Sequence, residues 1–250
     1  MYSAIPYESG YVLATGGGIQ FSTPKTKRLF TSADGLGTTS FYAVAQSDSK
    51  IYGISEYGLI AAYDKASSHW SVENRSYLNN KVAVVPGQAV VEKNNLVIAF
   101  ENRLAFYDTD QKAFLLTIDK IGGISLASVT PQKISSAGDS LFVLLGKDVY
   151  ARKMDWDNMA KDMRLVDPSS WVKKTGSKNT SRYFGGQISD FSKIKRETKK
   201  KQKKTKKTCF ALSVLIFCVT LWLDNACKTR MPENGAAFFS CFRTDNNHRA

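Results

Sequence analysis

Short apolar runs of strand length return along this chain at a nearly constant spacing. The clearest begin at Ile51, Leu96 and Leu141, positions that lie 45 residues apart. A weaker copy at residues 11–24 begins about 40 residues earlier. A period of about 40 to 45 residues with several strands in each unit is typical of the blades of a β-propeller.

Within each unit, strands alternate with short polar turns. Val, Ile, Leu and aromatic residues fill the runs, while Gly, Asn, Asp and Lys fill the turns between them, as hairpins require. The segments 81–91 and 124–134 can supply the remaining strand of a blade. In the two clearest units, strands are expected at residues 51–55, 59–63, 69–72, 96–100, 103–107 and 113–118.

These repeats predict an all-β fold, a WD40-like β-propeller of about four degenerate blades. The Gly-His and Trp-Asp pairs of strict WD40 repeats are missing at the expected positions. The alternative is a plain antiparallel meander or sandwich without circular closure. Four blades are at the lower end of the usual range, and an unclosed propeller exposes sheet edges and a blade face. We therefore expect an incomplete propeller, finished by a partner or by a longer form of the chain.

The composition changes along the chain divide it into four parts. Residues 1–154 are predicted to form the propeller blades, and residues 155–192 a polar, partly helical linker. A lysine-rich tail at 193–207 follows, and an apolar segment with a C-terminal tail fills 208–250. The basic tail is expected to be disordered.

The positive charge is concentrated in that tail. The net charge is +13, and residues 193–207 alone hold nine lysines and one arginine against one glutamate. Such a run predicts a nuclear address read by an import receptor and salt-sensitive phosphate contacts to RNA, without base readout. The alternatives are a polybasic flank on a membrane and a solvated tail. The residues concerned are Lys193, Lys195, Arg196, Lys199, Lys200, Lys201, Lys203, Lys204, Lys206 and Lys207.

Residues 209–223 form an uncharged, apolar run directly after the lysines. Spanning a bilayer takes about 20 residues, so this run is marginal for a tail anchor. An alternative C-terminus of unrelated composition explains it equally well. All four cysteines lie after the lysine run, and no secretory leader pattern opens the chain, so the blades are expected to fold in a reducing compartment.

Candidate catalytic residues are few. The chain has two histidines, His69 and His248, and no Gly-x-Ser-x-Gly nucleophile elbow. The cysteines lack the paired spacing of a zinc site. The triple glycine at 16–18 lacks the Lys-Ser/Thr of a phosphate loop and is expected to be a hairpin turn. We expect no enzymatic activity, no cofactor and no metal.

Two segments, Ala43–Glu73 and Leu96–Thr109, resemble the nucleolar protein 11 family, which bears a propeller and belongs to the small-subunit processome. The similarity lies in a Gln-Ser-Asp turn, the strand pair around IYGISEYGLIAAYD, a Trp-Ser-Val strand and the hairpin LVIAFENRLAFYD. The resemblance implies a non-enzymatic scaffold in rRNA transcription and early pre-rRNA processing. The family's helical C-terminal region has no counterpart here, which puts docking through that region in doubt.

The leading hypothesis is therefore a scaffold of the nucleus and nucleolus that docks other proteins on its blade faces and takes part in ribosome biogenesis. The runner-up is a tail-anchored adaptor at an intracellular membrane, held by residues 209–223. A third hypothesis, an enzyme built on a propeller, lacks a clustered set of catalytic residues.

Overall fold

The computed structural model of the chain describes residues 1–75, 81–161, 167–174 and 183–184. All of them belong to one compact unit, Met1–Ser189. The second unit, Asp190–Ala250, lies outside the described residues.

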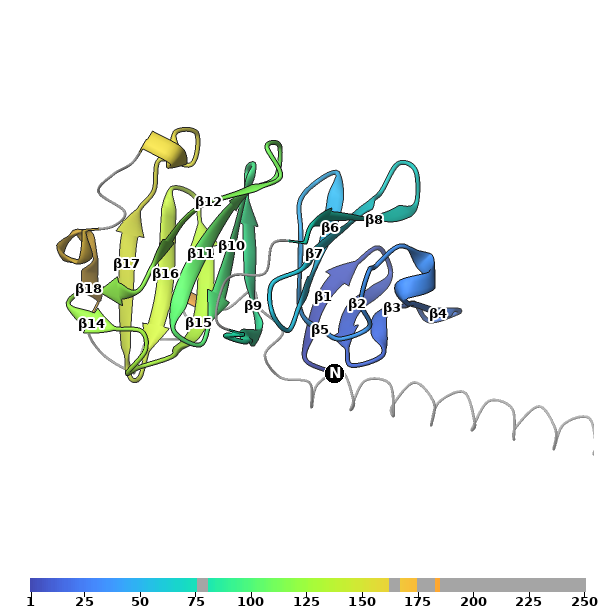
Figure 1. Ribbon diagram of the computed structural model, residues 1–250, viewed down its shortest axis with the longest axis horizontal. Helices are drawn as coiled ribbons and strands as arrows, with labels where there is room; N and C mark the ends of the chain where they lie inside the picture. Colours follow the sequence, from blue (N-terminus) through green and yellow to red (C-terminus); the bar gives the residue numbers. More distant parts are fainter. Residues whose placement is uncertain (76–80, 162–166, 175–182, 185–250) are drawn as a thin grey trace, which may run out of the picture. The chain divides into compact units, whose positions relative to one another are not determined.

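The described chain folds into four separate four-stranded antiparallel sheets, each made of consecutive strands (Figure 1). We call them blades 1 to 4 in chain order. Blades 1 and 2 contain β1 (Ser3–Tyr7), β2 (Gly10–Thr15), β3 (Gly18–Ser22) and β4 (Lys27–Phe30), then β5 (Phe41–Gln46), β6 (Lys50–Ser55), β7 (Ile60–Asp64) and β8 (His69–Asn74). Blades 3 and 4 contain β9 (Val84–Glu92), β10 (Asn95–Phe100), β11 (Arg103–Asp108) and β12 (Ala113–Ile118), then β15 (Pro131–Ala137), β16 (Ser140–Leu145), β17 (Asp148–Lys153) and β18 (Val172–Lys174).

Short elements occupy the connections between these strands. A small hairpin precedes blade 4, and three single 3₁₀ turns lie before blade 2 and between the last two strands of blade 4. The elements are η1 (Ser32–Asp34), β13 (Lys120–Ile121), β14 (Ile124–Ser125), η2 (Met159–Lys161) and η4 (Pro168–Ser170).

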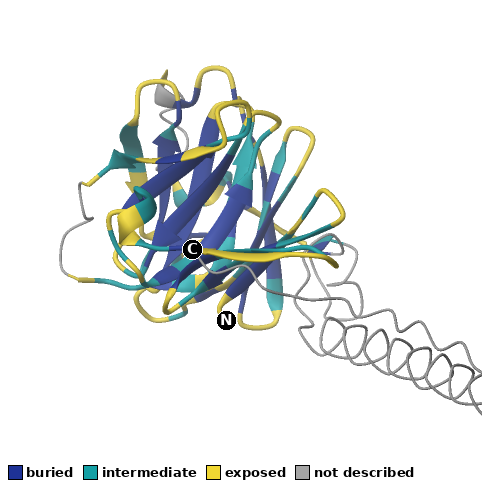
Figure 2. Ribbon diagram, turned by 90° about the vertical axis from the view of Figure 1, so that its right-hand side faces the viewer, coloured by how far each residue is buried: buried dark blue, intermediate teal, exposed yellow. Residues whose placement is uncertain are grey.

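Burial follows the position of a strand within its blade, as Figure 2 shows by the dark strands and the yellow hairpins. Every residue of β10 is buried, because this middle strand has a blade packed against each of its faces. By contrast, β4 and β18 are mostly exposed at the outer edges of their sheets. A strand buried on both faces reads as a continuous apolar run rather than an alternating one.

The hydrophobic core consists of three clusters, each between two consecutive blades. Trp70 and Phe41 lie between blades 1 and 2, Tyr107 between blades 2 and 3, and Phe106 and Trp171 between blades 3 and 4. None of these clusters joins blade 1 to blade 4 among the described residues. The contacts between neighbouring blades are most extensive along their first strands, β1, β5, β9 and β15.

The fold class expected from the repeats is confirmed: the blade region that the structure describes is all-β, and its four sheets are built like propeller blades. The expected strands of the second and third units coincide with β6, β7, β8, β10, β11 and β12 to within two residues. A meander or sandwich would form one or two continuous sheets instead of four separate ones.

The blade region extends past residue 154, where the sequence placed its end. Strand β18 pairs with β17, so that Val172 lies opposite Ala151 and completes the fourth sheet. Residues 155–192 are predicted to form a partly helical linker, and the described residues of this segment contain the 3₁₀ turns η2 and η4, the strand β18 and two helical residues at 183–184. The sequence around Val172 is polar and does not look like a strand. An outer edge strand can have this composition, because it does not need an apolar run.

Candidate partner-binding surface

The residues predicted to form the nuclear address, Lys193 to Lys207, lie outside the described residues, and so does the apolar run 209–223. Their roles therefore stay predictions. In the described part of the chain, no helix has the length and hydrophobicity required to cross a bilayer.

The few candidate catalytic residues occupy an exposed strand position and a hairpin turn. His69 is an exposed residue at the start of β8, the outer strand of blade 2. The triple glycine forms the tight turn between β2 and β3, where a side chain on Gly18 would lie 2.0 Å from the carbonyl oxygen of Phe30. No group of three His, Cys, Asp or Glu side chains in the described residues could hold a metal ion.

Three tyrosines and two glutamates gather where the ends of blades 1, 2 and 3 meet. Tyr2 precedes β1, Tyr42 belongs to β5, Glu56 and Tyr57 form the β6–β7 turn, and Glu101 begins the β10–β11 turn. We call these five residues the tyrosine–glutamate surface. Its residues come from blades 1, 2 and 3 and are far apart in the sequence. The first strands of these blades, β1, β5 and β9, pack against one another and bring the five residues close together.

The aromatic part of this surface is open to solvent. The rings of Tyr2 and Tyr42 are stacked, with centroids 4.5 Å apart and an interplanar angle of 29°. Tyr2 is 36% exposed and Tyr57 is 37% exposed, although tyrosine is usually at least partly buried. Exposed tyrosines of this kind are enriched in protein interfaces, where the ring supplies apolar area and the hydroxyl remains hydrogen-bonded.

The two carboxylates act on these tyrosines. A hydrogen bond to the Glu56 carboxylate, together with the charges of Glu56 and Glu101, raises the pKa of Tyr57. Burial is the first cause that raises the pKa of Tyr42, and the charge of Glu56 is the second. Neither glutamate forms an ion pair among the described residues.

Backbone hydrogen bonds within blades 2 and 3, and one between these blades, hold the two glutamates in place. The amide of Val84, at the start of blade 3, donates to the carbonyl of Glu56 over 2.7 Å. The amide of Glu56 donates to the carbonyl of Ser40 over 3.4 Å, and the amide of Glu101 donates to the carbonyl of Ala83 over 3.0 Å. The surface is thus attached to the ends of strands rather than to a free loop.

The β6–β7 turn that carries Tyr57 is itself tightly specified. The Ser55 hydroxyl accepts from the amide of Leu59 at 2.9 Å, and the amide of Gly58 donates to the carbonyl of Ser55 at 3.1 Å. Gly58 has a φ of +93°, and its Cα faces the Phe100 ring so closely that a Cβ there would lie 3.0 Å from the ring. Glycine adopts this φ without steric cost.

A hollowed surface lies on the face of blade 4 that points away from blade 3. A cavity of about 810 Å³ has Phe142, Ala151 and Val172 in its apolar lining, with Lys153 and Lys174 beside them. The ring of Tyr183 lies 5.0 Å from that of Phe142, and the Ser135 hydroxyl donates to the Tyr183 carbonyl at 2.5 Å. Residue 183 of the chain therefore already covers part of this face.

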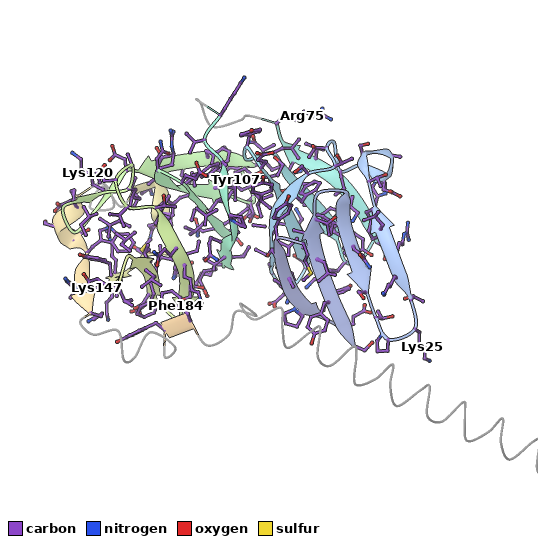
Figure 3. The ribbon with its side chains drawn as sticks, turned by 90° about the horizontal axis from the view of Figure 1, so that it is seen from below. Lys25, Arg75, Tyr107, Lys120, Lys147 and Phe184 are labelled. Atoms are coloured by element: carbon purple, nitrogen blue, oxygen red, sulfur yellow. The ribbon has the colours of Figure 1, made fainter. Side chains whose placement is uncertain are left out.

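A buried polar group lies between blades 2 and 3. Nζ of Lys50 lies 2.6 Å from Oε1 of Glu73, whose side chain is 2% exposed. The second oxygen of Glu73 and the nearby hydroxyl of Tyr107 are buried without a hydrogen bond of ordinary geometry. The pKa of Tyr107 is raised, mainly by burial and then by the charge of Glu73. Figure 3 labels the Tyr107 side chain among the packed side chains of the blades. The position of this group between two sheets suits a structural role.

Comparisons with known proteins concern the fold. No protein-family model matches the chain, and no curated protein matches it. Among solved structures, it is similar to PorZ, a surface component of the type-IX secretion system of Porphyromonas gingivalis (16% identity, 70% of this chain and 22% of that chain, TM-score 0.49). It is also similar to the RRP9 WD40 repeats (11% identity, 67% of this chain and 48% of that chain, TM-score 0.48). A third similar structure is BamB from Moraxella catarrhalis (10% identity, 60% of this chain and 44% of that chain, TM-score 0.42).

The chain thus spans between about a fifth and a half of these matched proteins. Similarities at this level of identity and TM-score say nothing about what the chain binds. Sequence reasoning missed the tyrosine–glutamate surface. The one signal in the sequence was Tyr57, an aromatic residue in a hairpin turn, where it does not contribute to the hydrophobic core.

Proposed function

We propose that this chain is a non-enzymatic propeller scaffold that docks other proteins. The observation that carries the proposal is the tyrosine–glutamate surface, which offers exposed rings and two carboxylates that form no ion pair among the described residues, on the joined ends of three blades. Binding sites of proteins concentrate energy in such aromatic anchors.

We further propose that the scaffold acts in the nucleolus, in rRNA transcription and pre-rRNA processing. The resemblance of residues 43–73 and 96–109 to the nucleolar protein 11 family supports this setting, and so does the dense positive charge of residues 193–207. In this proposal the lysines bind an import receptor and add salt-sensitive affinity for RNA.

The test is the location of the tagged full-length chain in cells, beside a chain cut after Lys207. The proposal expects nucleolar signal from both. Replacing the lysines of residues 199–207 with glutamine is expected to abolish nuclear enrichment. Signal on a reticular network or an organelle rim, lost on truncation, would overturn the proposal in favour of the tail-anchored membrane adaptor.

A further inference from the structure

We propose that the tyrosine–glutamate surface binds a cationic segment of a partner protein, an extended stretch that presents arginine or lysine side chains. This inference rests on the proposed scaffold function and names the chemistry of its partner. Its three grounds are the exposed rings, the carboxylates without an ion pair, and the fixed backbone that carries them.

The rings provide the first ground. Tyr2 and Tyr57 are exposed, and the Tyr2 ring rests on that of Tyr42 at 4.5 Å, so its orientation is defined. The face of an aromatic ring carries negative potential and attracts a guanidinium or ammonium group placed over it. Three rings near one another offer such a group more than one face.

The carboxylates provide the second ground. Glu56 and Glu101 place two carboxylates beside the three rings, and both contribute to the raised pKa of Tyr57. The nearest basic side chain in the sequence, Arg103, donates from Nε to Oδ1 of Asn102 at 2.9 Å, and it forms no ion pair with either glutamate. An arginine from a partner could satisfy such a carboxylate with two parallel hydrogen bonds.

The backbone provides the third ground. Glu56 and Glu101 are each held by an amide or carbonyl of a neighbouring strand, at 2.7 Å and 3.0 Å. Binding to groups that are already in position costs less conformational entropy than binding to a loose loop. The joined blade ends thus form a prepared site for a cation between rings and carboxylates.

The experiment measures binding of labelled nine-residue peptides to the full-length chain by fluorescence anisotropy. One peptide alternates glycine and arginine, and its matched control carries citrulline, which keeps the shape of arginine and loses its charge. We expect the arginine peptide to bind about tenfold more tightly. Equal affinity for the two peptides would overturn the inference.

Variants locate the site on the protein. The double variant E56Q/E101Q is expected to weaken arginine-peptide binding about tenfold. The matched control E8Q/E92Q removes the same charge at the opposite ends of the strands and is expected to change affinity less than about twofold. If the two double variants weaken binding equally, the attraction is the overall charge and the proposed site is wrong.

The aromatic contribution is tested separately. Y57F keeps the ring and is expected to retain binding, whereas Y57A is expected to lose affinity several-fold. Thermal unfolding of each variant checks that it is folded. Loss of affinity in Y57F as well as Y57A would contradict a ring contact. The inference can fail in this way while the nucleolar location of the tagged chain still holds, so the two proposals are separable.

Discussion

The side chain of Glu73 is buried between blades 2 and 3, and its Oε1 lies 2.6 Å from Nζ of Lys50. Its other oxygen, Oε2, makes no hydrogen bond of ordinary geometry. A buried carboxylate that loses its partner destabilises a protein more than the pair stabilised it, because the remaining charge stays without compensation. Stability in this region therefore depends on Lys50 more than its partly exposed position suggests.

Replacing Lys50 with methionine is expected to lower the free energy of unfolding by about 3 kcal/mol. Urea unfolding followed by tryptophan fluorescence measures it. The double variant K50M/E73L removes both charges and is expected to recover most of the loss. The control K93M breaks the exposed pair Lys93–Asp157 and is expected to cost less than about 1 kcal/mol. Equal losses in K50M and K93M would show that Glu73 is not electrostatically buried.

Tyr107 gives the fold a sensitivity to alkali. Its pKa is raised in the folded state, so between the unfolded value of about 10 and the raised value the unfolded chain loses a proton that the folded chain keeps. Stability is therefore fully present below pH 10 and declines as the pH rises through that window. The pKa of Lys50 is also raised, by its hydrogen bond to Glu73, and acts with the same sign.

Replacing Tyr107 with phenylalanine is expected to flatten this decline. The measurement is the free energy of unfolding at pH 7, 10 and 11 for the variant, the parent and the control Y11F, whose side chain is only partly buried. At pH 7 the variant should be at least as stable as the parent, because the buried hydroxyl that it removes makes no hydrogen bond of ordinary geometry. Parallel pH curves for Y107F and the parent would count against this account.

At the level of the element, β6 shows how closely two blades approach. Gly53 lies in the middle of this strand, where a Cβ would come within 2.2 Å of Cδ1 of Ile19 and 3.1 Å of the Phe41 ring. Every residue from Ile51 to Ser55 is buried. The absence of a side chain at Gly53 therefore serves the packing of blade 1 on blade 2, and no turn requires it.

The variant G53A is expected to lower the free energy of unfolding by about 1 to 3 kcal/mol through overpacking. The control G17A places its methyl in the β2–β3 turn, where the nearest atom is 3.9 Å away, and should change stability by less than about 0.5 kcal/mol. Adding I19V to G53A removes the clashing Cδ1 and is expected to restore part of the loss. Denaturant unfolding compares the four proteins, and an unaltered G53A would show that the blades can move apart at no cost.

The sequence predicted the middle strands well, and it missed two of the outer strands, β4 and β18. Strands such as β10 consist of apolar residues throughout, so their limits stand out from the polar turns around them. β4 and β18 pair on one side only and expose their lysines, so nothing in their composition separates them from a loop. The boundary at residue 154 followed from this, because the last strand of blade 4 looks like linker.

The tyrosine–glutamate surface could not be predicted because it depends on how the blades meet. Tyr2 and Tyr42 are distant in the sequence, yet their rings are stacked. A repeat of 45 residues predicts that blades stack in order, and it does not say which turn residues then face one another. The lysines of residues 193–207 could be named as candidates from the sequence alone, because a lysine run has the same chemistry in any fold. Their role stays a prediction.

At the scale of the whole molecule, blade 4 depends on residues beyond the point where the repeats fade. Trp171, just before β18, is 4% exposed and belongs to the hydrophobic cluster between blades 3 and 4. Phe184 is 6% exposed, so the chain up to that residue takes part in the packing. The folding unit therefore reaches beyond the last clear repeat by some thirty residues.

We expect a chain ending at Ser189 to unfold at the same urea concentration as the full chain. A chain ending at Lys161 lacks both Trp171 and β18, and its free energy of unfolding should fall by at least about 3 kcal/mol. The single variant W171A in the full chain separates the loss of one side chain from the loss of the strand. Identical midpoints for the two truncated chains would place the edge of the folding unit before residue 162.

The order of strands has a consequence for synthesis on the ribosome. Each described blade takes its four strands in sequence order, so none waits for a partner encoded far downstream. At about 5 to 20 residues per second, one repeat emerges in about 2 to 9 seconds, whereas a hairpin forms in about 1 to 10 microseconds. A nascent chain can therefore finish one sheet before the next is translated. It then leaves only the newest apolar face for chaperones to shield.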